Sequence, residues 1–317
     1  MNLYEALESY IQIKRSMGAV FSSDQSVLRA FARMMGDIPV NALNQEACKA
    51  FCLGNGPPTR WWERKDQTLR GFFNYLMARG HLGRPLLPDH GPRIPRSFEA
   101  YIYSLEELQR LLDGTVILKN SRYRLSPLTL RTLLMLLYGA GLRLSEGLRL
   151  RCCDVDLGSR VLTIWDTKFF KSRLVPIGND LKKALISYAD ARRCLPMPAG
   201  TNSVFFASRH GTAISLATLE GAFARVRAHA GITRPMNARW QPRLHDLRHA
   251  FAVHRLITWY REGADVQSCL PLLATYLGHI NISGTQTYLS MTPELLSEAS
   301  KRFECYAAIG AKESSHE

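Results

Sequence analysis

One segment near residue 90 divides this chain and limits what it can fold into. Residues Arg79–Ser97 (RGHLGRPLLPDHGPRIPRS) contain four prolines and three glycines. Proline removes a backbone N–H and interrupts a helix, and glycine loosens the backbone, so no long helix continues through this segment. We therefore expect an interdomain linker over residues 81–100, with one domain over residues 1–80 and a second over residues 101–317.

The first domain repeats apolar residues at helical spacing. This spacing predicts four helices: Leu3–Met17, from Ser22 or Ser23 to Met35, Gln45–Leu53, and Pro58–Arg79. Neither an internal repeat nor a low-complexity tract interrupts the pattern. Four helices in a domain of this size predict a small all-α module.

The second domain is also mainly helical, with one island of strand pattern. Ser104-Leu-Glu-Glu has the form of a capping box that opens a helix, and Leu128–Gly139 is an apolar helix suited to a core. Arg160–Asp166 and Arg173–Ile177 flank a short basic stretch, as in a β-hairpin, and Val204–Phe206 is a candidate third strand. Further helices are expected over Leu181–Arg193, Leu216–Ala230, His245–Glu262, Cys269–Leu277 and Thr292–Ala308. The predicted fold class is mainly α with a small β-sheet (α+β).

The charge of the chain points to a polyanionic partner. It carries 41 lysine and arginine residues against 27 acidic ones, a formal net charge of +14. Such a balance favours nucleic acid first and an anionic membrane surface second. The sequence lacks the run of about 18 apolar residues that a membrane helix needs, and its start lacks the pattern of a signal peptide. The seven cysteines are scattered without a CxxC pair, so we expect reduced thiols, no metal site and a cytoplasmic protein.

Two basic elements of the second domain are candidates for chemistry. In the segment GLRLSE, Arg143 is expected at or near a helix start, where backbone N–H groups also favour an anion. A solvated arginine beside Glu146 is an equally good interpretation of this segment alone. The predicted hairpin carries Lys168, Lys171 and Arg173. A lysine on a mobile hairpin can deliver a proton to a leaving group on a bound phosphate, but a basic turn can also serve only to discourage strand pairing.

Two histidine motifs and a tyrosine follow. Residues i and i+3 of a helix share a face, so His245 and Arg248 are expected to converge on one point. There an imidazole can manage a proton and a guanidinium can grip two phosphate oxygens. His249 is expected to point elsewhere and to be structural. A glycine ends the helix before His279, and Tyr288 lies nine residues later in a polar stretch.

The order of these elements resembles the tyrosine recombinases of the phage integrase superfamily. The matching elements are G-L-R-x-S-E, a lysine hairpin that ends in R-L-V-P-I, H-x-L-R-H, L-G-H and the final tyrosine. The resemblance extends from about Ser104 to about Leu296, and the helical module in front is similar to the family's core-binding (SAM-like) domain. It implies a site-specific DNA recombinase or integrase of a mobile element or chromosome. The layout is similar to the compact Xer, Cre or integron type, without an arm-binding domain.

The resemblance also implies a role for each matching residue. Arg143 and Arg248 would bind the non-bridging oxygens of the scissile phosphate, with Glu146 supporting Arg143. Tyr288 would attack phosphorus to form a 3′-phosphotyrosyl bond and release a 5′-hydroxyl. Because this ester conserves the energy of the broken bond, neither ATP nor a metal nor any other cofactor is expected.

Proton transfer would fall to lysine and histidine side chains. Lys168 matches the first lysine of the family's hairpin and would protonate the 5′-oxygen. Lys171 is the alternative, because the phenylalanine pair in the turn departs from the glycine or asparagine of many relatives. His245 would assist proton transfer, and His279 would hydrogen-bond the phosphate.

DNA contacts are expected outside the catalytic residues as well. The candidates are basic residues of the first domain and the hairpin: Arg60, Arg64, Lys65, Arg70 and Arg173. Aromatic residues accompany those of the first domain and are expected mostly in the core: Trp61, Trp62, Phe72 and Phe73.

The resemblance implies double-stranded DNA with specific sites as the partner. It also implies a homo-oligomer, a dimer on one site and a tetramer in the synapse, with a second recombinase or a directionality factor as a possible addition. An amphipathic helix over Thr292–Ala308 would dock on a neighbouring protomer, or pack on its own domain instead. Its apolar face would contain Leu295, Leu296, Phe303 and Tyr306. Such a protein would work in the cytoplasm, at the nucleoid.

Two alternatives keep the fold but change the function. One is a DNA-binding architectural or regulatory protein without the chemistry, and the other is a type IB topoisomerase that relaxes supercoils without strand exchange. Covalent trapping on DNA separates the first from a recombinase, and relaxation without recombination would identify the second. Two further tyrosines are rival nucleophiles on paper. Tyr276 lies in an apolar helical run and is expected in the core, and Tyr306 lies too far downstream.

Overall fold

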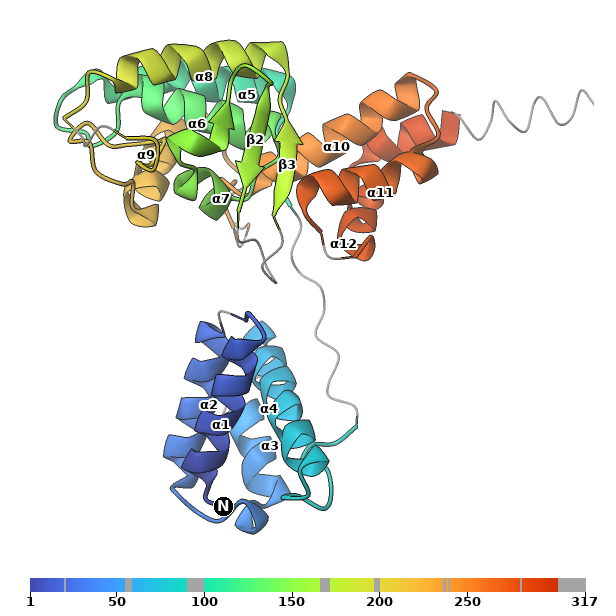
Figure 1. Ribbon diagram of the computed structural model, residues 1–317. Helices are drawn as coiled ribbons and strands as arrows, with labels where there is room; N and C mark the ends of the chain where they lie inside the picture. The colour runs from blue at the N-terminus through green and yellow to red at the C-terminus, as the bar shows by residue number, and fades with distance from the viewer. Residues whose placement is uncertain are drawn as a thin grey trace, which may run out of the picture. The chain divides into compact units, whose positions relative to one another are not determined.

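The computed structural model describes residues 1–19, 21–54, 59–89, 100–165, 172–196, 200–235, 238, 240–279 and 281–301. The chain divides into two compact units, one over Met1–Phe98 and one over Glu99–Thr167 and Lys171–Glu317. Both units are mainly helical, and a small antiparallel sheet lies in the second (Figure 1). The predicted fold class is therefore confirmed.

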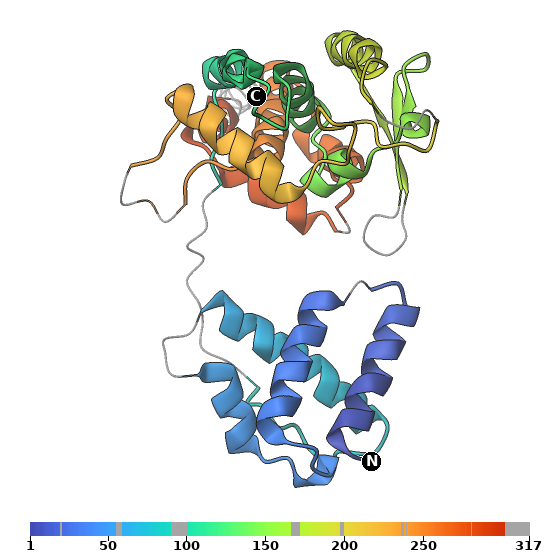
Figure 2. The ribbon, with the colours of Figure 1, turned by 90° about the vertical axis from the view of Figure 1, so that its left-hand side faces the viewer.

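The described part of the first unit contains four α-helices. They are α1 (Leu3–Ser16), α2 (Ser22–Met35), α3 (Gln45–Leu53) and α4 (Arg60–Ala78), with a 3-10 turn at Val40–Ala42. Polar side chains fix the helix starts, because Asn44 and Thr59 accept hydrogen bonds from the first turns of α3 and α4. Helices α1 and α2 lie side by side, and α4 packs against both (Figure 1 and Figure 2). All four predicted helices are confirmed, with ends that move by at most two residues.

An aromatic and aliphatic core holds the first unit together. Phe31, Phe72 and Phe73 are buried, and their rings meet edge-on or tilted, a favourable arrangement for aromatic pairs. Leu86 and Leu87, which belong to the predicted linker, are buried in the same core. The packed part of this unit thus continues past residue 80, and residues 90–99 of the predicted linker lie outside the described residues.

The second unit contains the remaining elements. In chain order they are α5 (Leu105–Gly114), η2 (Thr115–Lys119), α6 (Pro127–Gly139), α7 (Leu144–Arg149), η3 (Cys152–Asp154), β1 (Val155–Asp156), β2 (Val161–Ile164), β3 (Arg173–Pro176), α8 (Asn179–Arg192), α9 (Leu216–His229), α10 (Asp246–Arg261), α11 (Val266–Leu277), α12 (Ser283–Gln286) and η4 (Thr287–Ser290). Residues 293–301 are also helical. Helix α11 begins at Val266 and not at Cys269, because the Asp265 side chain caps it and the helix accommodates Pro271.

The sheet has the strand order β1-β2-β3, and its neighbours are antiparallel. In β2 and β3, Val161 pairs with Pro176 and Ile164 pairs with Arg173. The two strands of the predicted hairpin are therefore confirmed. The basic stretch between them, residues 166–171, lies outside the described residues.

The third strand is β1, so the prediction of a strand over Val204–Phe206 is wrong. Val204 makes only an isolated bridge, to Arg151. The carbonyls of Val204 and Phe205 instead accept hydrogen bonds from the Arg192 guanidinium, at 3.2 and 2.9 Å from its Nε. A side chain thus satisfies backbone groups that a strand would have paired.

Helix α6 forms the centre of the main core of the second unit. Its leucines are buried on several faces, and it packs against α8 and α10. A second core joins α10, α11 and the segment after them, and it includes Tyr288 and Leu295. Figure 1 shows α10, α11 and α12 grouped at one end of the unit. Helix α10 contributes to both cores, with Leu247 and Ala250 in the first and Ala252 and Val253 in the second.

Candidate active site

The loop after α6 places Arg143 at the start of α7. The backbone N–H of Arg143 donates to Glu146 Oε2 at 2.9 Å, which anchors the first turn of the helix. Its guanidinium donates to Glu146 Oε1 at 2.8 Å and to the carbonyl of Gly278 at 2.7 Å. The Arg143 side chain is 33% exposed. Arg143 thus lies at a helix start beside Glu146, as its sequence predicts.

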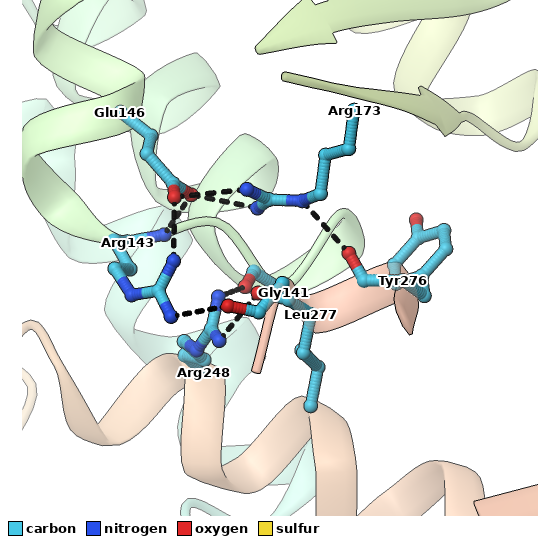
Figure 3. A network of polar contacts seen from close by, with 8 residues as sticks. Gly141, Arg143, Glu146, Arg173, Arg248, Tyr276 and Leu277 are labelled. Carbon is cyan, nitrogen blue, oxygen red and sulfur yellow. Dashed lines mark hydrogen bonds and ion pairs between the residues drawn. The ribbon is translucent and has the colours of Figure 1, made fainter. Parts of the chain in front are cut away.

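Glu146 is shared with Arg173, the first residue of β3. Arg173 donates to both carboxylate oxygens, at 3.0 and 2.8 Å, and to the carbonyl of Tyr276 at 3.0 Å (Figure 3). Burial raises the pKa of the Glu146 carboxyl, but the hydrogen bonds and charge of Arg173, with the hydrogen bonds of Arg143, outweigh burial and lower it to about 2. The sequence predicts a DNA contact for Arg173, whereas its guanidinium forms an internal ion pair with Glu146.

Arg248 lies on the first turn of α10 and is 2% exposed. Its guanidinium donates to the carbonyls of Gly141 at 2.7 Å and Leu277 at 2.6 Å. Burial and the charge of Arg143 lower the pKa of Arg248 to about 10, so it remains protonated at neutral pH. Gly141 has a φ of +57°, and a Cβ there would lie 2.6 Å from the Phe251 ring. This position therefore requires glycine if its carbonyl is to reach Arg248.

Three arginines converge on the C-terminal end of α11. The carbonyls of residues 276, 277 and 278 accept, in that order, from Arg173, Arg248 and Arg143 (Figure 3). The last carbonyls of a helix have no partner within the helix and carry its negative partial charge, so cations are favourable there. The end of α11 and the Glu146 carboxylate together hold three positive side chains close to one another.

Two histidines face the site from the start of α10. The His245 and His249 rings lie 4.9 Å apart between centroids, and His249 also lies 5.6 Å from the ring of Tyr288. The expectation that His249 points elsewhere is therefore wrong, because residues i and i+4 of a helix share a face as i and i+3 do. Burial and the charge of His245 lower the pKa of His249 to about 4. Desolvation and the charges of Arg248 and Arg243 also lower the pKa of His245.

Tyr288 lies between imidazole rings. His279 follows the glycine that ends α11, and its ring stacks on Tyr288 with 6.1 Å between centroids. Its Nδ1 lies 2.7 Å from the hydroxyl of Thr285, a buried residue that no sequence motif marks. Tyr288 is 3% exposed. Burial raises the pKa of Tyr288, although the charge of Arg248, a hydrogen bond with Arg248 and the charge of Arg143 act in the opposite direction.

Other candidates lie apart from this group or outside the described residues. Tyr276 donates from its hydroxyl to the carbonyl of Pro176 at 3.0 Å and stacks on Phe251, which agrees with its expected place in the core. Lys168 and Lys171 lie outside the described residues.

The basic residues of the first unit also make internal contacts. Arg64 and Arg70 each form an ion pair with an aspartate, at 2.6 and 2.7 Å, and the Lys65 ammonium donates to a backbone carbonyl at 2.8 Å. Arg60 is exposed. Of the aromatic residues beside them, three are buried and one is exposed: Trp62, Phe72 and Phe73, and Trp61.

The site combines guanidinium groups, imidazoles and a tyrosine hydroxyl, a set suited to binding and attacking a phosphate. The described residues include no group of three or more His, Cys, Asp or Glu side chains placed to hold a metal ion. In the same part of the chain, no helix is both long and apolar enough to cross a membrane.

Comparison with known proteins gives a consistent result. The model of the phage integrase family matches residues 107–294. A Sinorhizobium fredii protein named as integrase/recombinase y4rE is 36% identical over 307 residues, which cover 95% of this chain and 95% of that protein. Tyrosine recombinase XerD of Listeria innocua is 30% identical over 258 residues, 80% of this chain and 79% of that protein. Among solved structures, a lambda integrase (75–356) dimer bound to a COC′ core site matches 92% of this chain and 97% of that one, with a TM-score of 0.66 and 17% identity.

Proposed function

The chain belongs to the phage integrase family, and on that basis we propose that this tyrosine-type site-specific recombinase cuts and rejoins DNA with Tyr288 as its nucleophile. The observation that carries the proposal is the convergence of Arg143, Arg248, His279 and Tyr288 around the start of α10 and the end of α11. These residues come from separate segments of the sequence. Their convergence supports a single phosphate site.

The charges around the site favour a phosphate between Arg143 and Arg248. The hydrogen bonds of Arg248 go to two neutral groups, the carbonyls of Gly141 and Leu277, and among the described residues no carboxylate forms an ion pair with it. Arg143 shares one carboxylate, that of Glu146, with a second arginine. Both guanidiniums therefore retain positive charge for the non-bridging oxygens and for the charge that develops in the pentacovalent transition state.

The proposed cleavage step exchanges one phosphate ester for another. The Tyr288 oxygen forms a bond to phosphorus and loses its proton, while the bond from phosphorus to the 5′-oxygen breaks and that oxygen takes a proton from Lys168 or Lys171. His245 assists proton transfer, and its lowered pKa favours the neutral imidazole, which can accept a proton. His279 hydrogen-bonds the phosphate. The phosphotyrosyl ester conserves the bond energy, so attack by a 5′-hydroxyl reverses the step without ATP or a metal.

DNA is the partner of this recombinase, and we extend the proposal to its assembly. A dimer on one site and a tetramer in the synapse are the proposed forms, and the lambda integrase dimer on a core site supports the first. Leu295 is buried in its own unit, which supports packing of residues 293–301 in cis, whereas Leu296 is exposed. Phe303 and Tyr306 of the predicted docking face lie outside the described residues. The DNA substrate would place the protein at the nucleoid in the cytoplasm, with a second recombinase or a directionality factor as a proposed partner.

Covalent trapping tests the nucleophile. A nicked suicide duplex from DNA that flanks the gene should give an SDS-resistant protein–DNA adduct with the wild type and none with Tyr288→Phe. Tyr138→Phe is a matched control, because it removes a hydroxyl that contacts His254 in the same unit and should leave the adduct intact. An adduct that persists in Tyr288→Phe would show that another residue attacks the phosphate.

The same assay separates the two alternative functions. DNA binding without any adduct would favour an architectural or regulatory protein of this fold. An adduct together with relaxation of supercoiled DNA, but no exchange between paired sites, would favour a topoisomerase-like activity.

A further inference from the structure

We propose that Arg173 is a positioning residue that ties the β2–β3 hairpin to both phosphate-binding arginines, through Glu146 and through the end of α11. The inference rests on the proposed roles of Arg143 and Arg248. It assigns to Arg173 a task inside the site, in place of the DNA contact that the sequence predicts.

The first link runs through Glu146. The Arg173 side chain is 10% exposed, and that of Glu146 is 8% exposed. Arg173 contacts both carboxylate oxygens in a bidentate pair, the strongest geometry for this kind of contact. The same two oxygens accept from the backbone and the guanidinium of Arg143. The position of Arg143 therefore depends on a carboxylate that Arg173 holds from the other side.

The second link runs through the backbone of α11. Arg173 holds the carbonyl of Tyr276, and the next two carbonyls hold Arg248 and Arg143. Three consecutive carbonyls have nearly fixed relative positions, so a shift of Arg173 at the first would move the partners of the other two. Gly278 leaves room for this contact, because a Cβ there would lie 2.8 Å from the Arg173 guanidinium.

The chemistry of its partners distinguishes Arg173 from Arg248, although both are buried. Arg248 donates to two neutral carbonyls, and its positive charge lowers the pKa of the proposed nucleophile, Tyr288. Arg173 donates through Nε and both terminal nitrogens to a carboxylate and a carbonyl, so its guanidinium is occupied, and its side chain is 10% exposed. Arg143 shares that carboxylate but is 33% exposed and leaves its Nε free of these contacts. The Arg173 guanidinium therefore fixes the positions of Glu146 and of the end of α11. It is a poor ligand for a DNA phosphate.

The main test compares cleavage with binding. Single-turnover formation of the Tyr288 adduct on the suicide duplex measures cleavage, and the dissociation constant of the same DNA, measured in the Tyr288→Phe background, measures binding. Arg173→Gln should lower the cleavage rate by about 100-fold, the scale of a displacement of about 1 Å, and should change the dissociation constant by less than about 3-fold. Arg173→Lys should restore only part of the rate, because an ammonium cannot span both oxygens and the carbonyl.

Arg192→Gln is the matched control. Arg192 also donates to backbone carbonyls, those of Val204 and Phe205, but these lie outside the site. Its loss should leave the cleavage rate unchanged. An Arg173→Gln variant that cleaves at the wild-type rate, or that loses DNA affinity in proportion to cleavage, would overturn the positioning role.

A double-mutant cycle tests whether Arg173 acts through Glu146. If it does, Arg173→Gln should lower the cleavage rate much less in a Glu146→Gln background than in the wild type. Independent action would instead multiply the two losses, which would contradict the first link of the proposal.

The pH profile gives a readout that loss of packing alone would not move. The charged groups that face Glu146 are Arg143 at the start of α7, Arg173 on β3 and, farther away, Arg248 on α10. Burial raises the pKa of Glu146, and without Arg173 only the hydrogen bonds of Arg143 remain to lower it, so the pKa should rise. The acid limb of the cleavage profile should therefore move to higher pH in Arg173→Gln and stay in place in Arg192→Gln.

A measurement without DNA keeps this proposal distinct from the proposed function. If the wild type forms no adduct at Tyr288, the proposed function fails, and the coupling is then measured by urea unfolding of the full chain. The loss of stability in Arg173→Gln should shrink as the pH falls, because Glu146 takes up a proton more readily in the variant. A loss that stays constant between pH 7 and pH 3 would overturn the coupling to Glu146.

Discussion

At the scale of single residues, His249 and His279 show how burial sets the charge of the site. Both rings lie against Tyr288, and burial is the largest cause that lowers the pKa of each to about 4. Nearby positive charge acts in the same direction, from His245 on His249 and from Arg248 on His279. The folded protein therefore keeps both imidazoles neutral at pH 7 and leaves the positive charge to the arginines.

These shifts predict that acid destabilises the fold. In the unfolded chain a histidine takes up a proton near pH 6.5, whereas in the folded chain these two take it up near pH 4. The unfolded state thus binds more protons between these values, and the free energy of unfolding should fall as the pH drops from about 6.5 to 4, by about 1.4 kcal/mol for each unit of pKa difference. Urea unfolding between pH 7.5 and pH 4.5 measures this fall. A His249→Gln/His279→Gln double variant should show a flatter dependence, and an unchanged one would contradict the prediction.

At the scale of elements, the C-terminal end of α11 organises the site. Helix α11 contributes no side chain to the cluster of arginines, but its last two carbonyls and that of its C-cap, Gly278, accept hydrogen bonds from the three guanidiniums. The helix ends because Gly278 adopts a left-handed conformation, with a φ of +69° and a ψ of 44°. The turn that follows carries His279 against Tyr288. One helix end therefore sets the relative positions of the arginines and the tyrosine.

A comparison of two glycines tests this role of the helix end. Gly278 and Gly263 both have positive φ, +69° and +73°, but only at Gly278 would an added Cβ approach the Arg173 guanidinium. Both Gly278→Ala and Gly263→Ala should destabilise the protein by about 1–2 kcal/mol, because alanine disfavours this conformation. Only Gly278→Ala should also slow adduct formation, by tenfold or more on the scale of a misplaced group near the reaction. Equal cleavage by the two variants, at matched stability, would contradict the role of the helix end.

At the scale of the whole molecule, excess positive charge accompanies the DNA substrate. Both predicted domains carry more lysine and arginine than acidic residues. Part of this charge is used internally, as the ion pairs of Arg64, Arg70 and Arg173 show. The exposed remainder, including Arg60, is what a DNA backbone can meet.

This charge predicts a steep dependence of DNA binding on salt. For six to ten phosphate contacts, affinity should fall by about 10³–10⁵-fold between 50 and 200 mM salt, measured by anisotropy with the Tyr288→Phe protein to avoid covalent capture. Arg60→Gln should reduce the slope by about one contact, whereas Arg70→Gln, whose guanidinium already pairs with Asp66, should change it less. A fall of less than about tenfold over this range would indicate that few phosphates are bound.

The sequence by itself determined the kind of protein and most of its elements. Apolar spacing located the helices of the first unit to within two residues, and the order of motifs from Arg143 to Tyr288 identified the family. Both signals are local, because helix periodicity and caps depend on neighbours a few residues apart. The strand expected over Val204–Phe206 failed for the opposite reason. The carbonyls of Val204 and Phe205 accept from Arg192, which lies 12 and 13 residues earlier, beyond the range of a strand pattern.

Only the tertiary structure decided how the site is held together. In the folded protein Arg173 pairs with Glu146, and the His249 ring lies against Tyr288. Three arginines donate to consecutive carbonyls at the C-terminal end of α11. An arginine in a sequence carries the same charge whether it meets DNA, a carboxylate or a helix end. Which partner an arginine binds depends on its burial and on the nearest acceptor. Both are set by how segments more than a hundred residues apart pack against one another.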